Sequence, residues 1–229
     1  TLKLNENVTD KDTITISHIG FKTKNILCNQ LAQETNIIEL QPEFEDLKEV
    51  VVKFVKPKPR KIGRNSKGLG LMHMNFYSFY ENDVDDRLSK EVGMQFKLKK
   101  DCKLNDFNFN ITSNEFKSLK FRLNFYQIEA GLPKKIVIDQ DIIFEIKDGF
   151  LGWYTLDLKP YKLYLDKEIQ DYAVTIQWIE SIKMNEKSKY FGISTAMSAT
   201  ETSFFREKAM DVWSKSGQSL SFYLNALCK

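Results

Sequence analysis

Histidine is scarce in this chain of 229 residues, and this shortage limits the chemistry that the chain can perform. The two histidines are His18 and His73, and neither lies in a catalytic signature. Gly-x-Ser-x-Gly, His-Glu-x-x-His and P-loop spacings are absent from the sequence. Nucleophilic catalysis needs a base beside the nucleophile, so we expect structural or surface histidines, no catalytic residue and no cofactor. The sequence therefore predicts a protein that is not an enzyme.

Cysteine is equally rare. Cys28, Cys102 and Cys228 lie far apart in the sequence, without a Cys-x-x-Cys pair. Because an odd number of cysteines cannot form a closed disulfide framework, we expect buried free thiols at these positions.

Long apolar runs, proline and glycine are also few. The longest apolar runs, such as residues 49–55, are as long as a strand and far shorter than the roughly 18 to 20 residues of a membrane helix. With 5 Pro, 10 Gly and 42% hydrophobic residues, disordered, collagen-like and low-complexity chains are excluded. The 34 basic and 31 acidic side chains nearly balance, so the surface as a whole does not attract polyanions. We expect a folded chain without a membrane span.

What the sequence does contain is apolar and polar residues that alternate with a period of two. Phe107, Phe109 and Ile111 are separated by Asn108 and Asn110, and the same alternation recurs along most of the chain. Successive side chains of a strand point to opposite faces, so the pattern predicts strands with one apolar face. Such strands must bury that face against a second sheet. We predict an all-β fold whose larger part is a jelly-roll-like antiparallel β-sandwich, with helix only at 203–214 and a single turn at 112–117.

A basic stretch divides the chain. No acidic residue lies between Glu49 and Glu81, and residues 56–70 combine lysine and arginine with Pro57 and Pro59. Proline lacks an amide donor and biases its predecessor toward extended geometry, so we predict a basic linker at 56–70. It would join a first domain at 1–55 to a second at 71–229. Aromatic residues do not interleave with these basic residues, apart from Phe54, so we expect no nucleic-acid binding.

Three motifs follow one another in the first domain, at residues 12–23, 38–42 and 47–52. They include predicted strands at 13–17, 22–27 and 36–40. Their order resembles the carboxypeptidase-regulatory-like domain of Bacteroidetes envelope proteins. The resemblance implies a small transthyretin-like β-sandwich without catalytic residues, located in the cell envelope, in the periplasm or at the outer-membrane surface.

The opening strands of that family have no counterpart here, so we expect the module at 1–55 to be incomplete, as in an N-terminally truncated chain. Either the native chain continues upstream of Thr1, or the remaining strands pack against the second domain. Unpaired sheet edges left by the missing strands could recruit a protein partner.

Aromatic side chains suggest a ligand for the second domain. Jelly-roll folds include many carbohydrate-binding modules, which lay flat rings against sugar faces while amide or charged side chains bond the hydroxyls. Tyr126 lies on the polar side of its strand with Arg122 and Asn124. We predict that these three residues bind a glycan through an exposed ring. Further ring candidates are Tyr161, Tyr164, Trp153 and Trp213.

Two acidic groups remain. Asp83, Asp85 and Asp86 form a dense acidic turn whose oxygens could coordinate a hard cation such as Ca²⁺, although their spacing is not that of an EF-hand. Asp139 and Asp141 share one strand face and could act as acid and base, but we expect them to be surface charges.

Taken together, these features predict a non-enzymatic envelope protein for binding or adhesion, with a polysaccharide as its ligand. The alternative is a structural or assembly component that recruits an envelope protein through exposed sheet edges.

Overall fold

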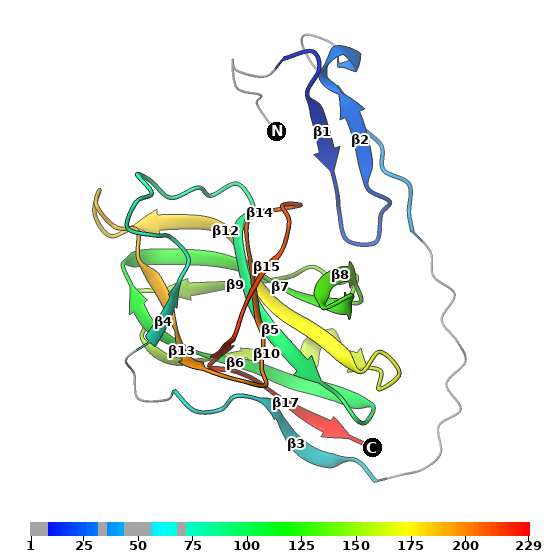
Figure 1. Ribbon diagram of the computed structural model, residues 1–229, viewed down its shortest axis with the longest axis vertical. Coiled ribbons are helices and arrows are strands. Elements are labelled where there is room, and N and C mark those ends of the chain that lie inside the picture. The colour runs from blue at the N-terminus through cyan, green and yellow to red at the C-terminus, as the bar shows by residue number, and fades with distance from the viewer. Residues whose placement is uncertain (1–8, 32–35, 44–55, 68–71) are drawn as a thin grey trace. The chain divides into compact units, whose positions relative to one another are not determined.

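The computed structural model describes residues 9–31, 36–43, 56–67 and 72–229 of the chain. The chain divides into two compact units, Thr1–Val52 and Lys53–Lys229 (Figure 1). All of the strand pairs in the described residues are antiparallel, and the only helical segments among them are two short 3₁₀ turns. The predicted all-β fold is therefore confirmed. No helix of the described residues is both long enough and apolar enough to cross a membrane.

The first unit contains a hairpin of β1 (Thr13–Ile16) and β2 (Lys24–Leu27), close to two of the predicted strands. The predicted third strand at 36–40 does not form; the described residues pair instead through a bridge between Phe21 and Pro42. The amide of Lys22 donates to the carbonyl of Gln41 at 2.8 Å. The motif at 47–52 lies outside the described residues.

The second unit contains a seven-stranded sheet with β12 (Asp171–Lys183) near its centre. One neighbour of β12 is β5 (Ser89–Lys97), and the other is β7 (Phe116–Glu129). The remaining strands lie outside these: β14 (Ser203–Lys208) and β15 (Ser214–Ser216) beyond β5, and β8 (Leu132–Ile136) and β9 (Ile142–Lys147) beyond β7.

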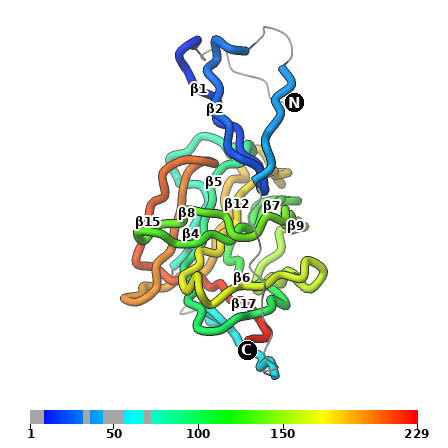
Figure 2. Tube along the Cα trace, turned by 90° about the vertical axis from the view of Figure 1, so that its right-hand side faces the viewer, coloured from blue at the N-terminus to red at the C-terminus, as the bar shows by residue number. Residues whose placement is uncertain are grey.

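An eight-stranded sheet is organised around the long strand β6 (Cys102–Asn114). Both views place the C-terminal strand β17 (Phe222–Cys228) beside β6, and the register agrees (Figures 1 and 2). β6 also pairs with β10 (Gly152–Asp157), β11 (Tyr164–Leu165) and β13 (Phe191–Met197). Outside these lie β3 (Lys58–Gly63), β4 (Met72–Asn75) and β16 (Gln218–Leu220).

The two sheets pack face to face as a sandwich around an aromatic core. Phe109 of β6 lies 5.9 Å from the ring of Phe144 in β9, and Phe121 of β7 lies 5.4 Å from Trp178 of β12. All of these rings except Phe144 are completely buried. Edge-to-face contacts at such distances add to the burial of large apolar area, so the core is well packed as well as apolar.

Two local predictions are wrong. Residues 203–214 form β14 and the turn toward β15 instead of a helix, and residues 112–117 belong to β6 and β7. In both places cross-strand pairing overrides the local helix preference. In β14, Phe205 pairs with Val92 of β5, and in β6, Asn114 pairs with Phe191 of β13.

Residues 58–63 of the predicted basic linker form a strand. β3 pairs along its whole length with β17, from Lys58 opposite Cys228 to Gly63 opposite Tyr223, so it belongs to the second unit. Proline is tolerated here because β3 is an edge strand, where an absent amide donor loses no ladder bond. Gly63 has a φ of 96°, and a Cβ there would lie 2.5 Å from the carbonyl oxygen of Phe222. Only glycine allows this close approach.

A disulfide joins Cys102 of β6 to Cys228 of β17, so the prediction of free thiols is wrong for both residues. The two cysteines are 126 residues apart in sequence but directly opposite in the sheet register, with a Cα–Cα distance of 4.1 Å. Cys28 is the free cysteine of the described residues.

We predict that replacing both Cys102 and Cys228 with serine lowers the free energy of unfolding by about 5 kcal/mol, because the crosslink closes a very long loop in the unfolded chain. Urea unfolding followed by tryptophan fluorescence measures the change. Cys28→Ser is the matched control and should keep the wild-type midpoint. Equal midpoints for wild type and the double variant would show that the bond does not form or does not stabilise the sandwich.

Candidate ligand-binding face

Tyr126 and Asn124 lie on the outer face of the seven-stranded sheet, but they surround a buried carboxylate. Glu91 of β5 is fully buried and accepts hydrogen bonds from Asn124 Nδ2 at 2.8 Å and from the Tyr126 hydroxyl at 3.0 Å. The hydroxyl of Thr175 also donates to it. Tyr126 is only 4% exposed, so its ring offers no surface to a sugar and the expectation of an exposed ring is wrong.

Arg206 of β14 neutralises this carboxylate. Its Nε and Nη2 donate to Glu91 Oε2 at 2.9 and 2.6 Å. The ring of Trp213 covers the guanidinium at 4.5 Å and meets Tyr126 edge-on at 5.5 Å. Burial, together with the Glu91 charge, raises the pKa of Tyr126 well above its usual value, so its hydroxyl stays protonated and donates. The cluster is a closed, satisfied network.

Arg122, the third residue of the predicted glycan site, points toward another partner. Its Nε donates to Asp141 Oδ1 at 2.6 Å, which also accounts for one carboxylate of the predicted Asp139–Asp141 pair. Asp139 is exposed. The structure therefore does not combine the three residues into an open binding surface.

We predict that Glu91→Ala lowers the free energy of unfolding by about 3 to 5 kcal/mol, because it leaves the guanidinium of Arg206 buried without its counter-ion. The double variant Glu91→Leu/Arg206→Leu removes both charges and should be more stable than Glu91→Ala alone. Chemical denaturation of the three proteins tests this. Glu91→Ala with wild-type stability would mean that the pair is not buried.

Each of the three carboxylates of the acidic turn has a different partner. Asp83 binds Lys183, and this hydrogen bond lowers the pKa of Asp83. Asp86 accepts from the indole of Trp178 at 2.8 Å. Asp85 accepts from the amide of Arg87 at 2.9 Å. Within the described ranges, no group of three or more His, Cys, Asp or Glu side chains could hold a metal ion, so Asp83, Asp85 and Asp86 do not converge on one point.

The two histidines belong to different units of the chain. His18 is exposed and meets the ring of Phe21 edge-on at 5.4 Å, and His73 is an exposed residue of β4.

An open, ring-bearing surface lies on the outer face of the eight-stranded sheet. Alternation along the strands points Trp153 of β10, Asn108 and Asn110 of β6 and Tyr223 of β17 outward, while Phe109 and Phe222 face the core. The rings of Trp153 and Tyr223 meet across β6 with centres 5.2 Å apart. Both rings are partly exposed.

Hydrogen bonds between side chains hold the polar groups beside these rings. Asp106 accepts from the amides of Asn108 and Asn225, the latter at 2.7 Å, and the hydroxyl of Thr155 donates to Asn108 Oδ1 at 2.7 Å. Burial and the nearby Asp106 carboxylate raise the pKa of Tyr223, so its hydroxyl keeps a proton to donate. The face therefore combines flat rings with amide and hydroxyl groups of set orientation.

A third ring lies farther along the same face. Tyr164 of β11 is 67% exposed and pairs with Lys103 of β6, whose ammonium lies 6.0 Å from the ring centre. Tyr223 pairs with Asn108, and Tyr164 pairs with Lys103, which lies opposite Leu227 of β17. Tyr223 and Leu227 are four positions apart, which corresponds to roughly 13 Å along the strand at about 3.3 Å per residue. We name Trp153, Tyr223, Tyr164, Asn108, Asn225, Lys61 and Lys103 the ring platform.

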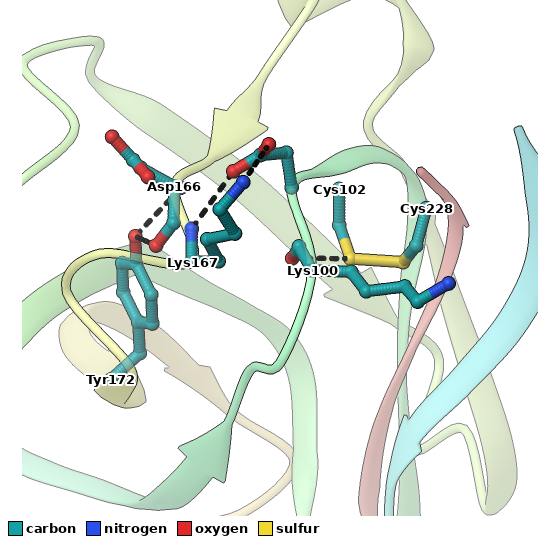
Figure 3. The surroundings of a disulfide bond; sticks show 7 residues. Lys100, Cys102, Asp166, Lys167, Tyr172 and Cys228 are labelled. Carbon is teal, nitrogen blue, oxygen red and sulfur yellow. Dashed lines mark hydrogen bonds and ion pairs between the residues drawn. A yellow bond between two sulfur atoms is a disulfide. The ribbon is translucent and has the colours of Figure 1, made fainter. Parts of the chain in front are cut away.

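The disulfide between Cys102 and Cys228 is shown in Figure 3, and the strand register places it next to the Tyr164 end of the ring platform. Cys102 pairs with Leu165 of β11 as well as with Cys228, so the crosslink lies one residue from Lys103. The turn after β11 is held by the Tyr172 hydroxyl, which accepts from the Asp166 amide at 2.8 Å and donates to the Asp166 carbonyl at 2.7 Å (Figure 3). Burial raises the pKa of Tyr172, which keeps this donor protonated.

Sequence reasoning considered two of these three rings but missed Tyr223. The signal for Tyr223 is its position between the inward-facing Phe222 and Leu224. An aromatic residue there lies on the outward side of the strand, where polar residues are expected. Lys61 was missed because residues 58–63 were assigned to a linker.

Comparisons with protein-family models, with curated proteins and with solved structures find no match for this chain. The resemblance of residues 1–55 to the carboxypeptidase-regulatory-like domain therefore stays a prediction.

Proposed function

We propose that this chain is a non-enzymatic envelope protein that binds a polysaccharide through the ring platform. The observation that carries the proposal is the alignment of Trp153, Tyr223 and Tyr164 along one open sheet face. Partly exposed rings can pack against the apolar faces of sugar rings, as aromatic side chains do in other recognition surfaces. The exposed Thr155 hydroxyl and the partly exposed Asn225 amide lie beside these rings and can bond sugar hydroxyls. Asn108 is only 3% exposed, and it holds Thr155 in place through the bond to its amide oxygen.

The shape of the surface suits a long chain better than a small substrate. The ring platform crosses strands β10, β11, β6, β17 and β3, and the positions of its rings extend over roughly 13 Å along the strands. A polymer can contact several rings at once, and each contact raises the effective concentration for the next. Weak individual contacts then combine into useful affinity.

An envelope location accords with the disulfide. Disulfides form and persist in oxidising compartments such as the periplasm and the cell surface, and they are rare in reducing ones. The bond between Cys102 and Cys228, with the resemblance of the first unit, supports this part of the proposal.

The alternative role, assembly through exposed sheet edges, has less support. The edge strand β3 contains Pro59 and several basic residues, and such residues commonly prevent an edge strand from pairing with a strand of another chain. On the other side of β6, the edge is made of two short strands, β10 and β11.

We predict that Tyr164→Ala and Trp153→Ala each weaken polysaccharide binding by about tenfold, as expected when an aromatic anchor worth about 1.4 kcal/mol is truncated. Affinity electrophoresis in gels containing single polysaccharides, followed by calorimetry on those that retard the protein, measures the change. Tyr80→Ala is the matched control, because Tyr80 is 90% exposed and is not part of the ring platform.

The far-ultraviolet circular dichroism of each variant must match that of the wild type. No retardation of the folded protein by a broad panel of neutral and acidic polysaccharides would refute the proposed function. Binding that survives both substitutions would place the site elsewhere.

A further inference from the structure

Two tyrosines of the ring platform each have a lysine ammonium over one side of the ring. The ammonium of Lys61 lies 5.3 Å from the ring centre of Tyr223, and that of Lys103 lies 6.0 Å from the ring centre of Tyr164. In each case the lysine comes from a different strand than the tyrosine: Lys61 is on β3 beside β17, and Lys103 is on β6 beside β11. The same pairing of a flat ring with a cation therefore occurs at both ends of the ring platform.

Within the part of the chain that the structure describes, neither lysine has a carboxylate partner. Among the described residues, no acidic group lies within ion-pair distance of Lys61 or Lys103. Asp106 lies in register with Lys61 across Asn225, and its Oδ1 accepts from the amides of Asn108 and Asn225. Asp101, two residues before Lys103, pairs with Lys167. Both ammonium groups are therefore available to an anionic group on a ligand.

The most basic stretch of the chain borders the same face. Residues 50–80 contain no aspartate or glutamate, and the part of this stretch that forms β3 carries Lys58, Arg60 and Lys61. β3 is the edge strand next to β17, and Lys61, which pairs with Asn225, points to the same side of the sheet as Tyr223. Lys58 and Arg60 pair with the core residues Cys228 and Ala226, so their side chains leave β3 on the opposite side. The near-neutral charge of the whole chain conceals this local excess.

We propose that the ring platform selects acidic polysaccharides, in which each tyrosine packs on a sugar ring while the adjacent lysine binds the carboxylate of a uronic acid. This inference rests on the proposed function. A uronic acid presents an apolar ring face and, at the ring edge, a carboxylate, which matches a tyrosine with an ammonium at its side. Charge attraction between exposed groups is modest for one pair, so selectivity builds up over the repeated pairs of a polymer.

The test compares two forms of one polymer, polygalacturonate and its fully methyl-esterified form, which share a backbone and differ in charge. We expect the full chain to bind polygalacturonate at least tenfold more tightly in calorimetry, and we expect this difference to shrink as salt is added. The variant Lys61→Gln/Lys103→Gln should lose roughly five- to tenfold in affinity for polygalacturonate and little for the ester.

Lys134→Gln/Lys187→Gln is the control, since it removes the same charge from β8 and from the turn between β12 and β13. It should bind like the wild type. An equal loss in this control would show unspecific attraction to a polyanion and overturn the inference.

The other outcomes separate the inference from the proposed function. Equal affinity for the two forms overturns the selection for acid but leaves polysaccharide binding in place. If neither form binds but neutral polysaccharides retard the protein, the conclusion is the same: the selection for acidic polymers is overturned, and polysaccharide binding remains. Binding to no polysaccharide at all removes both.

Discussion

The pairing of β6 with β17 is the constraint on which the rest of the second unit depends. β6 is the strand from which most of the eight-stranded sheet is built, and β17 closes it with the last residues of the chain. Long-range pairing of this kind loses chain entropy before it gains contacts, and the disulfide between Cys102 and Cys228 lowers that cost. The inward side chains of both strands enter the aromatic core, while their outward side chains form the ring platform. One register therefore determines both the core and the candidate site.

The outer faces of the two sheets have opposite characters. On the seven-stranded sheet, Trp213 covers Arg206, and the polar groups around Glu91 satisfy one another away from water. Such a network leaves no group free to meet a ligand, and its energetic importance lies in the loss that follows when one member is removed. On the eight-stranded sheet the rings remain partly exposed and the lysines lack carboxylate partners among the described residues. The outer face of the eight-stranded sheet is therefore the better candidate for binding a ligand.

The period-two pattern predicts many strands of the second unit and their inward faces, because burial on one side of a sheet imposes alternation directly on the sequence. It fails at β3 and β14, which were expected as linker and helix. The pattern could not show what covers an outward face. Tyr126 and Tyr223 both alternate with core residues and point away from the core, yet Tyr126 is buried beneath Trp213 and Tyr223 is partly exposed. Similarly, the partnership of Cys102 and Cys228 and the strand at Lys58–Gly63 depend on pairing with residues more than 120 positions away, which local composition does not encode.

The central claim is that a polysaccharide binds across β10, β11, β6, β17 and β3. Amide and side-chain chemical-shift mapping during a titration of the isotope-labelled protein with polygalacturonate oligomers tests it most directly. The account predicts that the largest shifts occur at the indole of Trp153 and around Tyr223, Lys61 and Tyr164, with the indoles of Trp178 and Trp213 unchanged. Shifts concentrated at Trp213 and Tyr126 on the seven-stranded sheet would contradict it.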